Sequence, residues 1–140
     1  MNKGFTLVEL IAVIVILALL VVITTPAYDS ISKNIKERNY NSKQSTIKSE
    51  TLSYVEKYLK DEVYNGTNKN ICFTVNFLIQ NGIISSDSET DEYIFNELDN
   101  VKFNGENIYI KVWYDTDNLK LKADAAKDEP FDDEECNKTY

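Results

Sequence analysis

One carboxylate, Glu9, lies inside an apolar run of nineteen residues, 5–23. A charge at the centre of a hydrocarbon-length segment costs about 2.5–3.5 kcal/mol even on a lenient insertion scale, so it is rarely kept without a partner or a task. As a helix the run would be roughly 28 Å long, close to the roughly 30 Å hydrocarbon core of a bilayer. We therefore expect one membrane-crossing helix in which Glu9 has a specific role.

The rest of the chain offers little catalytic chemistry. It contains no His, which removes the commonest general base and metal ligand. We find no nucleophile–base pair and no phosphate-cradling glycine loop, so the sequence predicts no enzyme, no metal site and no cofactor. A net charge of −8 without a basic face also argues against a nucleic-acid partner.

The residues around the apolar run indicate its orientation. Lys3 and the N-terminal amine precede the run, and no Ala-x-Ala-like cleavage site follows it. The positive-inside rule then keeps residues 1–4 in the cytoplasm and places the chain after Thr24 outside. Roughly 110 residues remain for one extracytoplasmic domain with a modest core.

The residues that lead into the run read Lys3-Gly4-Phe5-Thr6-Leu7-Val8-Glu9. This segment resembles the prepilin signature of type IV pilins and of the pseudopilins of type II secretion and DNA-uptake machines. The resemblance implies cleavage between Gly4 and Phe5 by a membrane-embedded prepilin peptidase, which also methylates the nitrogen of Phe5. It implies a homopolymeric helical filament, with the inner-membrane assembly machinery and minor pilins as further partners. It is strong over residues 1–28 and only architectural beyond them.

Cleavage would give Glu9 a partner, because the Phe5 nitrogen changes from a neutral amide to an ammonium. Within one helix this nitrogen and Glu9 are about 6 Å apart along the axis, so the amine of a neighbouring subunit is better placed. We therefore expect Glu9 to pair across subunits during assembly. The alternative is that Glu9 is solvated at the membrane surface, or protonated, and has no role.

Pro26 follows the apolar run. Proline removes a backbone donor and clashes with the preceding turn, so it could end the helix or kink a longer one. The resemblance favours the kink.

Residues 27–64 read as an amphipathic helix. Apolar residues recur at helical spacing in two groups, with a polar stretch at 36–45 that we expect to form a neck and that has Tyr40 as its apolar residue. The two groups are Tyr28, Ile31 and Ile35, and then Leu52, Val55, Leu59 and Val63. Basic residues exceed acidic ones between positions 27 and 60, which suits either a solvated face or charge pairing between subunits.

Residues 65–140 read as a head. Thr74 is expected to cap a short helix that Asn81-Gly82 stops, and strands are predicted at 101–103, 108–114 and 119–123. Tyr109 and Trp113 would lie on the opposite face from Ile110 and either cover a second layer or offer a contact surface. The fold class is thus α+β, a long N-terminal helix packed on a small antiparallel β-meander.

Two cysteines, Cys72 and Cys136, would lie outside the cell. An exported chain with an even cysteine count favours a disulfide, and closing so long a loop contributes roughly 4 kcal/mol in the chain-entropy model. The alternative is two reduced thiols. Many pilins have a disulfide near the C-terminus, and the resemblance implies the same here.

Two acidic segments invite a calcium interpretation. Residues 115–118 lack the glycine and the distal glutamate of a calcium loop, so we interpret them as a hairpin turn. The acidic tail at 128–135 could be solvated, bind calcium, or meet the basic neck of a neighbouring subunit.

The chain is thus divided into a cleaved leader (1–4), a membrane and assembly helix (5–26), an amphipathic helix (27–64) and a head (65–140). The predicted function is that of a structural subunit of a type IV pilus, in the cytoplasmic membrane before assembly and on the cell surface afterwards. A pseudopilin and a signal-anchored extracellular binding domain are the alternatives. Retention of the leader would indicate the anchored domain.

Overall fold

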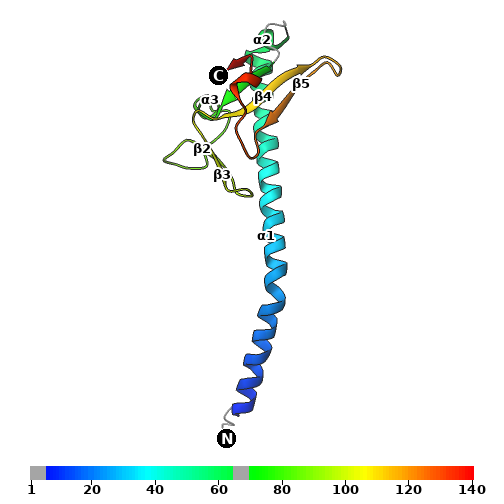
Figure 1. The fold of residues 1–140 in the computed structure, drawn as a ribbon, viewed down its shortest axis with the longest axis vertical. Coiled ribbons are helices and arrows are strands. Elements are labelled where there is room, and N and C mark those ends of the chain that lie inside the picture. Colours follow the sequence, from blue (N-terminus) through cyan, green and yellow to red (C-terminus); the bar gives the residue numbers. More distant parts are fainter. Residues whose placement is uncertain (1–5, 65–69) are drawn as a thin grey trace. The chain divides into compact units, whose positions relative to one another are not determined.

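The computed structural model describes residues 6–64 and 70–140, apart from the side chains of residues 23–27. These residues form two compact units, which are divided between residues 36 and 37. Helix α1, Leu7–Tyr58, begins in the first unit and ends in the second (Figure 1).

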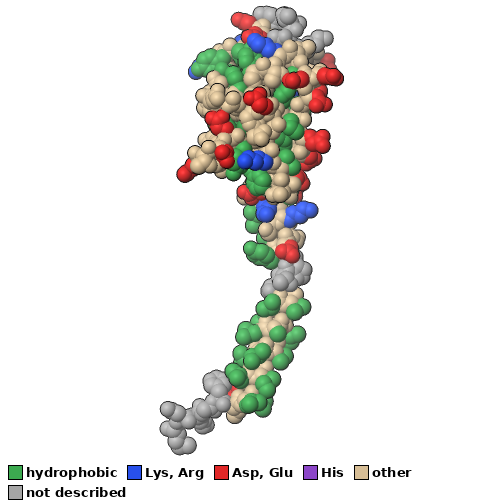
Figure 2. All heavy atoms as spheres, turned by 60° about the vertical axis from the view of Figure 1, so that its left-hand side comes forward, with side chains coloured by type: hydrophobic (Ala, Val, Ile, Leu, Met, Phe, Trp, Pro, Cys, Tyr) green, Lys and Arg blue, Asp and Glu red, His purple; other side chains and the backbone are tan. Residues whose placement is uncertain are grey.

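The first unit consists of the N-terminal part of α1. Its large apolar side chains are exposed, from 48% at Val13 to 75% at Leu7, and Figure 2 shows them along this stretch. The next apolar group, Tyr28, Ile31 and Ile35, is also more than half exposed. Among the described residues, no helix has the length and the hydropathy that crossing a membrane requires.

Pro26 lies inside α1, which continues through it for more than thirty residues. The proline therefore does not end the helix. The kink stays a prediction, because the side chain of Pro26 is outside those described.

The C-terminal part of α1 packs on the head through the second apolar group. Val55 is fully buried, and Leu52 and Leu59 pack against the core. The helix does not reach residue 64 as one piece, because Leu59 separates it from a short helix, α2, Lys60–Tyr64. At the break, the Glu62 N–H donates to the Leu59 carbonyl only three residues away, at 3.1 Å.

The prediction of a neck at residues 36–45 is wrong for the second half of this range, which packs on the head. Tyr40 is 6% exposed and Gln44 is 4% exposed. Both donate to the carbonyl of Ala126, from the Tyr40 hydroxyl at 3.3 Å and from Gln44 Nε2 at 2.9 Å. Polar side chains here belong to the buried face because this carbonyl gives their donors a partner.

A four-stranded sheet lies against this part of α1, with the strand order β5-β4-β1-β6 (Figure 1). All pairs are antiparallel except β1 with β6. The strands are β1 (Asn70–Thr74), β4 (Ile108–Asp115), β5 (Lys120–Ala125) and β6 (Lys138–Thr139). The core includes Ile71, Phe73, Ile110 and Val112, all fully buried.

A separate two-stranded ribbon joins β2 (Tyr93–Asn96) to β3 (Val101–Asn104). The expected α+β class and the long N-terminal helix are confirmed. The strand order differs from a simple meander, because β3 pairs with β2 instead of β4 and because β1 lies beside β4.

Tyr109 packs inside the head rather than offering a contact surface. Phe73 lies opposite Ile110 and Thr74 opposite Ile108, so Tyr109 is the extra residue of a β-bulge. Its ring packs edge-on against Phe103, 4.9 Å between centroids, and its hydroxyl lies 3.3 Å from that of Tyr40. Burial raises the pKa of both tyrosines, so both stay neutral hydroxyls.

The short helix α3, Val75–Gln80, begins and ends as the sequence predicts. Thr74 Oγ1 accepts from the Phe77 N–H at 3.3 Å. Gly82 has φ +66°, which glycine adopts without strain, and its N–H donates to the Ile79 carbonyl. A last 3₁₀ turn, η1, covers Asp133–Glu135.

Candidate functional site

The first site is the start of α1, where Glu9 has a partner within its own chain. The Thr6 N–H and the Thr6 hydroxyl each donate to Glu9 Oε2 at 2.9 Å. In return, the Glu9 N–H donates to Thr6 Oγ1 at 3.3 Å. This reciprocal arrangement is a capping box, which satisfies N–H groups that a helix start leaves unpaired.

The capping box changes the account of Glu9 given by the sequence. The expected partner was an amine created by cleavage, yet the carboxylate is already hydrogen-bonded to Thr6 in the uncleaved chain. Sequence reasoning overlooked Thr6, although Thr and Glu three residues apart before an apolar run is the pattern that predicts such a cap. Glu9 also lies in the first turn, where the helix dipole favours a negative charge.

Gly4 and Phe5, the expected cleavage and methylation positions, lie outside the described residues. The site can therefore be described from Thr6 onward. The side chains that follow are exposed and apolar, with Leu7 and Val8 both more than 70% exposed.

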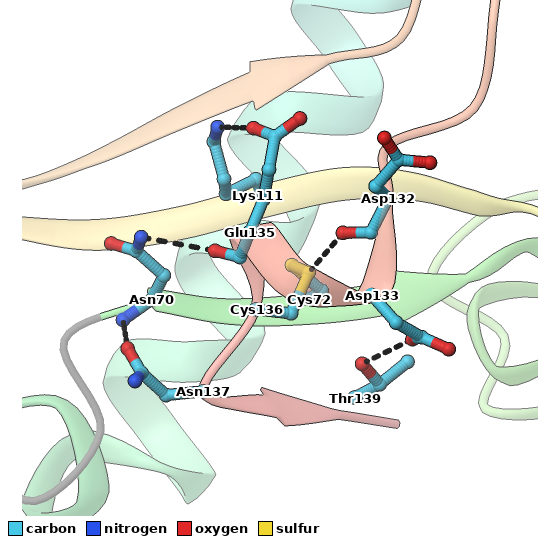
Figure 3. The surroundings of a disulfide bond; sticks show 9 residues. All are labelled: Asn70, Cys72, Lys111, Asp132, Asp133, Glu135, Cys136, Asn137 and Thr139. Carbon is cyan, nitrogen blue, oxygen red and sulfur yellow. Dashed lines mark hydrogen bonds and ion pairs between the residues drawn. A yellow bond between two sulfur atoms is a disulfide. The ribbon is translucent and has the colours of Figure 1, made fainter.

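The second site is the disulfide between Cys72 and Cys136, which the structure forms as expected (Figure 3). Cys72 lies on β1, and Cys136 directly follows η1. The surrounding contacts hold the C-terminal segment in place: the Asn70 N–H donates to Asn137 Oδ1 at 2.9 Å, and Lys111 pairs with Glu135 at 2.5 Å.

The C-terminal residue is held as well. The Thr74 N–H donates to the Tyr140 backbone carbonyl at 2.8 Å, and the Tyr140 N–H donates to the Cys72 carbonyl at 2.9 Å. Glu62 on α2 accepts from the Tyr140 hydroxyl at 2.6 Å and from Lys138 at 2.7 Å. The chain end is thus bonded to both β1 and α2.

The comparisons with known proteins concern the first site. A family model described as a prokaryotic N-terminal methylation motif matches residues 1–25. The chain carries a prepilin-type N-terminal methylation motif. This motif is the hallmark of type IV pilins and pseudopilins, which confirms the resemblance stated from the sequence. A search of curated proteins and of solved structures found no match.

The prepilin motif points to a structural subunit rather than to an enzyme. In the part of the chain that the structure describes, no three His, Cys, Asp or Glu residues are placed to hold a metal ion. The acidic tail is largely exposed, apart from the pairing of Glu135 and a contact from the Thr139 hydroxyl to Asp133 at 3.4 Å.

Residues 115–118 form the predicted hairpin turn, between β4 and β5. Asp115 Oδ1 accepts from the N–H groups of Asp117 and Asn118, at 3.0 and 3.2 Å. The ion pair with Lys122 has the largest effect on the Asp115 carboxylate, and the hydrogen bond from the Asn118 side chain adds to it. Together they hold the pKa of Asp115 well below its usual range.

Two lysines of the basic helix pair with the head of the same chain. Lys43 bonds Asp87, and Lys48 pairs with Asp124 at 3.3 Å. Lys43 and Lys48 therefore form ion pairs within their own chain, instead of being only solvated or pairing with a neighbouring subunit.

Proposed function

We propose that the chain is the structural subunit of a type IV pilus filament and that it polymerises through its N-terminal helix. The observation that carries this proposal is the methylation motif at residues 1–25, continued by a helix whose apolar side chains are exposed. A soluble domain rarely exposes so large an apolar surface. A helix that lies first in a bilayer and then in a bundle of like helices buries this surface in both environments.

In this proposal the precursor resides in the cytoplasmic membrane with its head outside. The prepilin peptidase removes residues 1–4 and methylates Phe5. The assembly machinery then draws the helix into a filament, where Glu9 exchanges its bond with Thr6 for the amine of a neighbouring Phe5. The head, closed by its disulfide, faces the outside of the fibre.

The test is N-terminal mass spectrometry of filaments sheared from cells that make the chain with a complete assembly machine. We expect the main component to begin at N-methylated Phe5. Gly4→Leu, which places a large side chain at the cleavage position, should leave the precursor in the membrane and give no filaments.

A wild-type chain that keeps residues 1–4 and never assembles would contradict the proposal and indicate a signal-anchored domain. A processed chain without surface fibres, seen by electron microscopy at native expression, would indicate a pseudopilin instead.

A further inference from the structure

An exposed leucine at the end of the β4–β5 hairpin is unusual for its place. Leu119 is 74% exposed and has φ +52°. This left-handed conformation is unfavourable for a bulky L side chain, whereas Gly or Asn adopts it readily. The turn is held rigidly by the bonds of Asp115 with Asp117, Asn118 and Lys122. Folding alone would therefore favour a different residue at position 119.

The head also has an apolar hollow that is not filled by its own side chains. It has a volume of about 350 Å³ and is lined by Ile47, Ile83 and Ile84 together with Gly82 and the polar residues Lys43, Thr46 and Ser85. The segment 82–84 is held against α3, because the N–H groups of Ile83 and Ile84 both donate to the Leu78 carbonyl, at 2.9 and 3.2 Å. The hollow is therefore preformed and large enough for one leucine side chain.

The hairpin and the hollow lie on different sides of the second unit. Figure 1 shows the β4–β5 turn projecting away from α3 and β2, and the segment 82–85 belongs to the connection between these two elements. A projection and a hollow at different places on one chain fit a head-to-tail contact between copies, which propagates instead of closing as a dimer.

The charges beside the two features are complementary. Lys120 follows Leu119, is exposed, and has no ion pair among the described residues. The segment 85–92, which begins at the edge of the hollow, contains four acidic residues and no basic one. Asp87 is already paired with Lys43 in the lining of the hollow, which leaves Glu89, Asp91 and Glu92 without an ion pair among the described residues. A second copy docking through Leu119 would bring Lys120 toward this acidic segment.

We propose that Leu119 of one subunit inserts into the hollow lined by Ile47, Ile83 and Ile84 of the next subunit in the filament. This inference rests on the proposed function, since it names a contact between heads that the helices bring together. Burial of Leu119 provides a reason for a leucine at a backbone position that suits glycine.

The first test separates assembly from folding. Leu119→Asn relieves the backbone and removes the apolar side chain, so the thermal midpoint of the full chain in detergent should stay equal or rise. The yield of sheared filaments per subunit should fall about ten-fold or more, as expected for losing one buried leucine. Leu119→Met, which keeps an apolar side chain, should assemble far better than Leu119→Asn.

The hollow is tested with a matched pair on α1. Thr46→Phe places an aromatic ring at the lining of the hollow and should lower the filament yield like Leu119→Asn. Ser45→Phe adds the same ring at the neighbouring exposed position, outside the lining, and should not. Normal filament yield from both Leu119→Asn and Thr46→Phe would overturn the inference.

A photo-crosslinking amino acid at position 119 of the full chain identifies the contact directly. In filaments and in membranes, adducts between chains should map to residues 82–85 or to the α1 turn around Ile47. Adducts that map only elsewhere would overturn the inference. The N-terminus of the wild-type chain, read in the same samples, decides the proposed function separately: an uncleaved chain without filaments contradicts that function, whichever adduct forms.

Discussion

Glu9 is one carboxylate with two candidate sets of partners. Within its own chain it accepts two bonds from Thr6 and caps α1. After the proposed cleavage at Gly4, a neighbouring subunit would offer an ammonium, and an ion pair in an apolar environment is stronger than a bond to a neutral donor. The capping box keeps the carboxylate satisfied until that partner arrives.

Capping and charge can be separated by mutation. Glu9→Gln keeps an acceptor for the cap but loses the charge, whereas Thr6→Val removes the capping hydroxyl and keeps the charge. We expect Glu9→Gln to lower filament yield about ten-fold or more, because the neighbour's ammonium loses its counter-charge. Thr6→Val should assemble nearly normally.

The measurement is filament mass in the sheared fraction relative to processed subunit in the membrane. Abundant filaments from Glu9→Gln would contradict pairing between subunits. A loss with Thr6→Val alone would show that the cap is what assembly requires.

Glu62 gives the head a predicted pH dependence. Bonds from Lys138 first, and then from Tyr140, lower the pKa of Glu62 in the folded head. A lowered folded pKa means that stabilisation is present above the unfolded pKa, about 4.3, and is lost as the pH falls through the folded value. The contact is only partly buried, with the Glu62 side chain 35% exposed, so solvent screens it and the effect should be modest.

Thermal midpoints of the full chain in detergent check this. Wild type should melt a few degrees above Glu62→Gln at neutral pH, and the two should converge in acid. Glu106→Gln is the control, since Glu106 is exposed and has no ion pair among the described residues, so it should match wild type throughout. A difference between wild type and Glu62→Gln that persists in strong acid would contradict the assignment.

At the scale of elements, the helices follow from the sequence more closely than the sheet does. The stripe of Leu52, Val55 and Leu59 and the cap at Thr74 are local patterns, and both are confirmed. The pairing of β3 depends on distant partners. The carbonyls of Gly105 and Asn107 accept from the first N–H groups of α3, at 2.9 and 3.0 Å. The segment 104–107 therefore resembles a hairpin turn in sequence but holds the start of α3 in the structure.

β1 was missed for a related reason. Its buried centre, Ile71–Phe73, is only three residues long and does not alternate with polar residues, so periodicity gives no signal. Its partners on either side, β4 and β6, lie more than thirty residues away in the chain. The disulfide could be predicted from composition and compartment, but the parallel strand beside it could not.

Removing the disulfide between Cys72 and Cys136 should loosen β6, the parallel strand beside it, before the rest of the head. The double variant Cys72→Ala with Cys136→Ala should lower the free energy of unfolding by about 4 kcal/mol, because the bond restricts a long loop of the unfolded chain. Urea denaturation of the full chain in detergent measures this, and wild type in reductant is the matched comparison.

Hydrogen exchange gives the location of the loosening. The Tyr140 and Thr74 amides, which bond across the β1–β6 edge, should exchange faster in the double variant. An unchanged unfolding free energy would mean that the non-covalent contacts of the C-terminal segment already suffice.

At the scale of the whole molecule, the described buried residues begin at Tyr40 and lie in the unit 37–140. The first unit contributes exposed apolar surface instead. From hydropathy, the sequence predicted a membrane and assembly helix at 5–26, an amphipathic helix at 27–64 and a head at 65–140. It could not predict that contact with the head begins as early as Tyr40, because a tyrosine and a glutamine in a polar stretch carry no apolar periodicity.

A chain that begins at residue 29 tests this division. It should be soluble without detergent, melt at the same temperature as the full chain, and sediment as a monomer at micromolar concentration. Circular dichroism and analytical ultracentrifugation measure these properties. Failure to fold would show that the N-terminal residues stabilise the head, and association equal to that of the full chain would show that polymer contacts lie mainly between heads.

The outer edge of β5 has a consequence for crowding. Lys120, Lys122 and Asp124 place a charged side chain at alternate positions of this strand, and charged residues on an edge strand disfavour pairing with another sheet. The opposite edge strand, β6, is only two residues long, and so short an edge offers little backbone for pairing with another sheet. Heads held side by side at high local density would therefore not pair their sheets into amyloid-like stacks. A filament built from them would dissociate into subunits that are still folded.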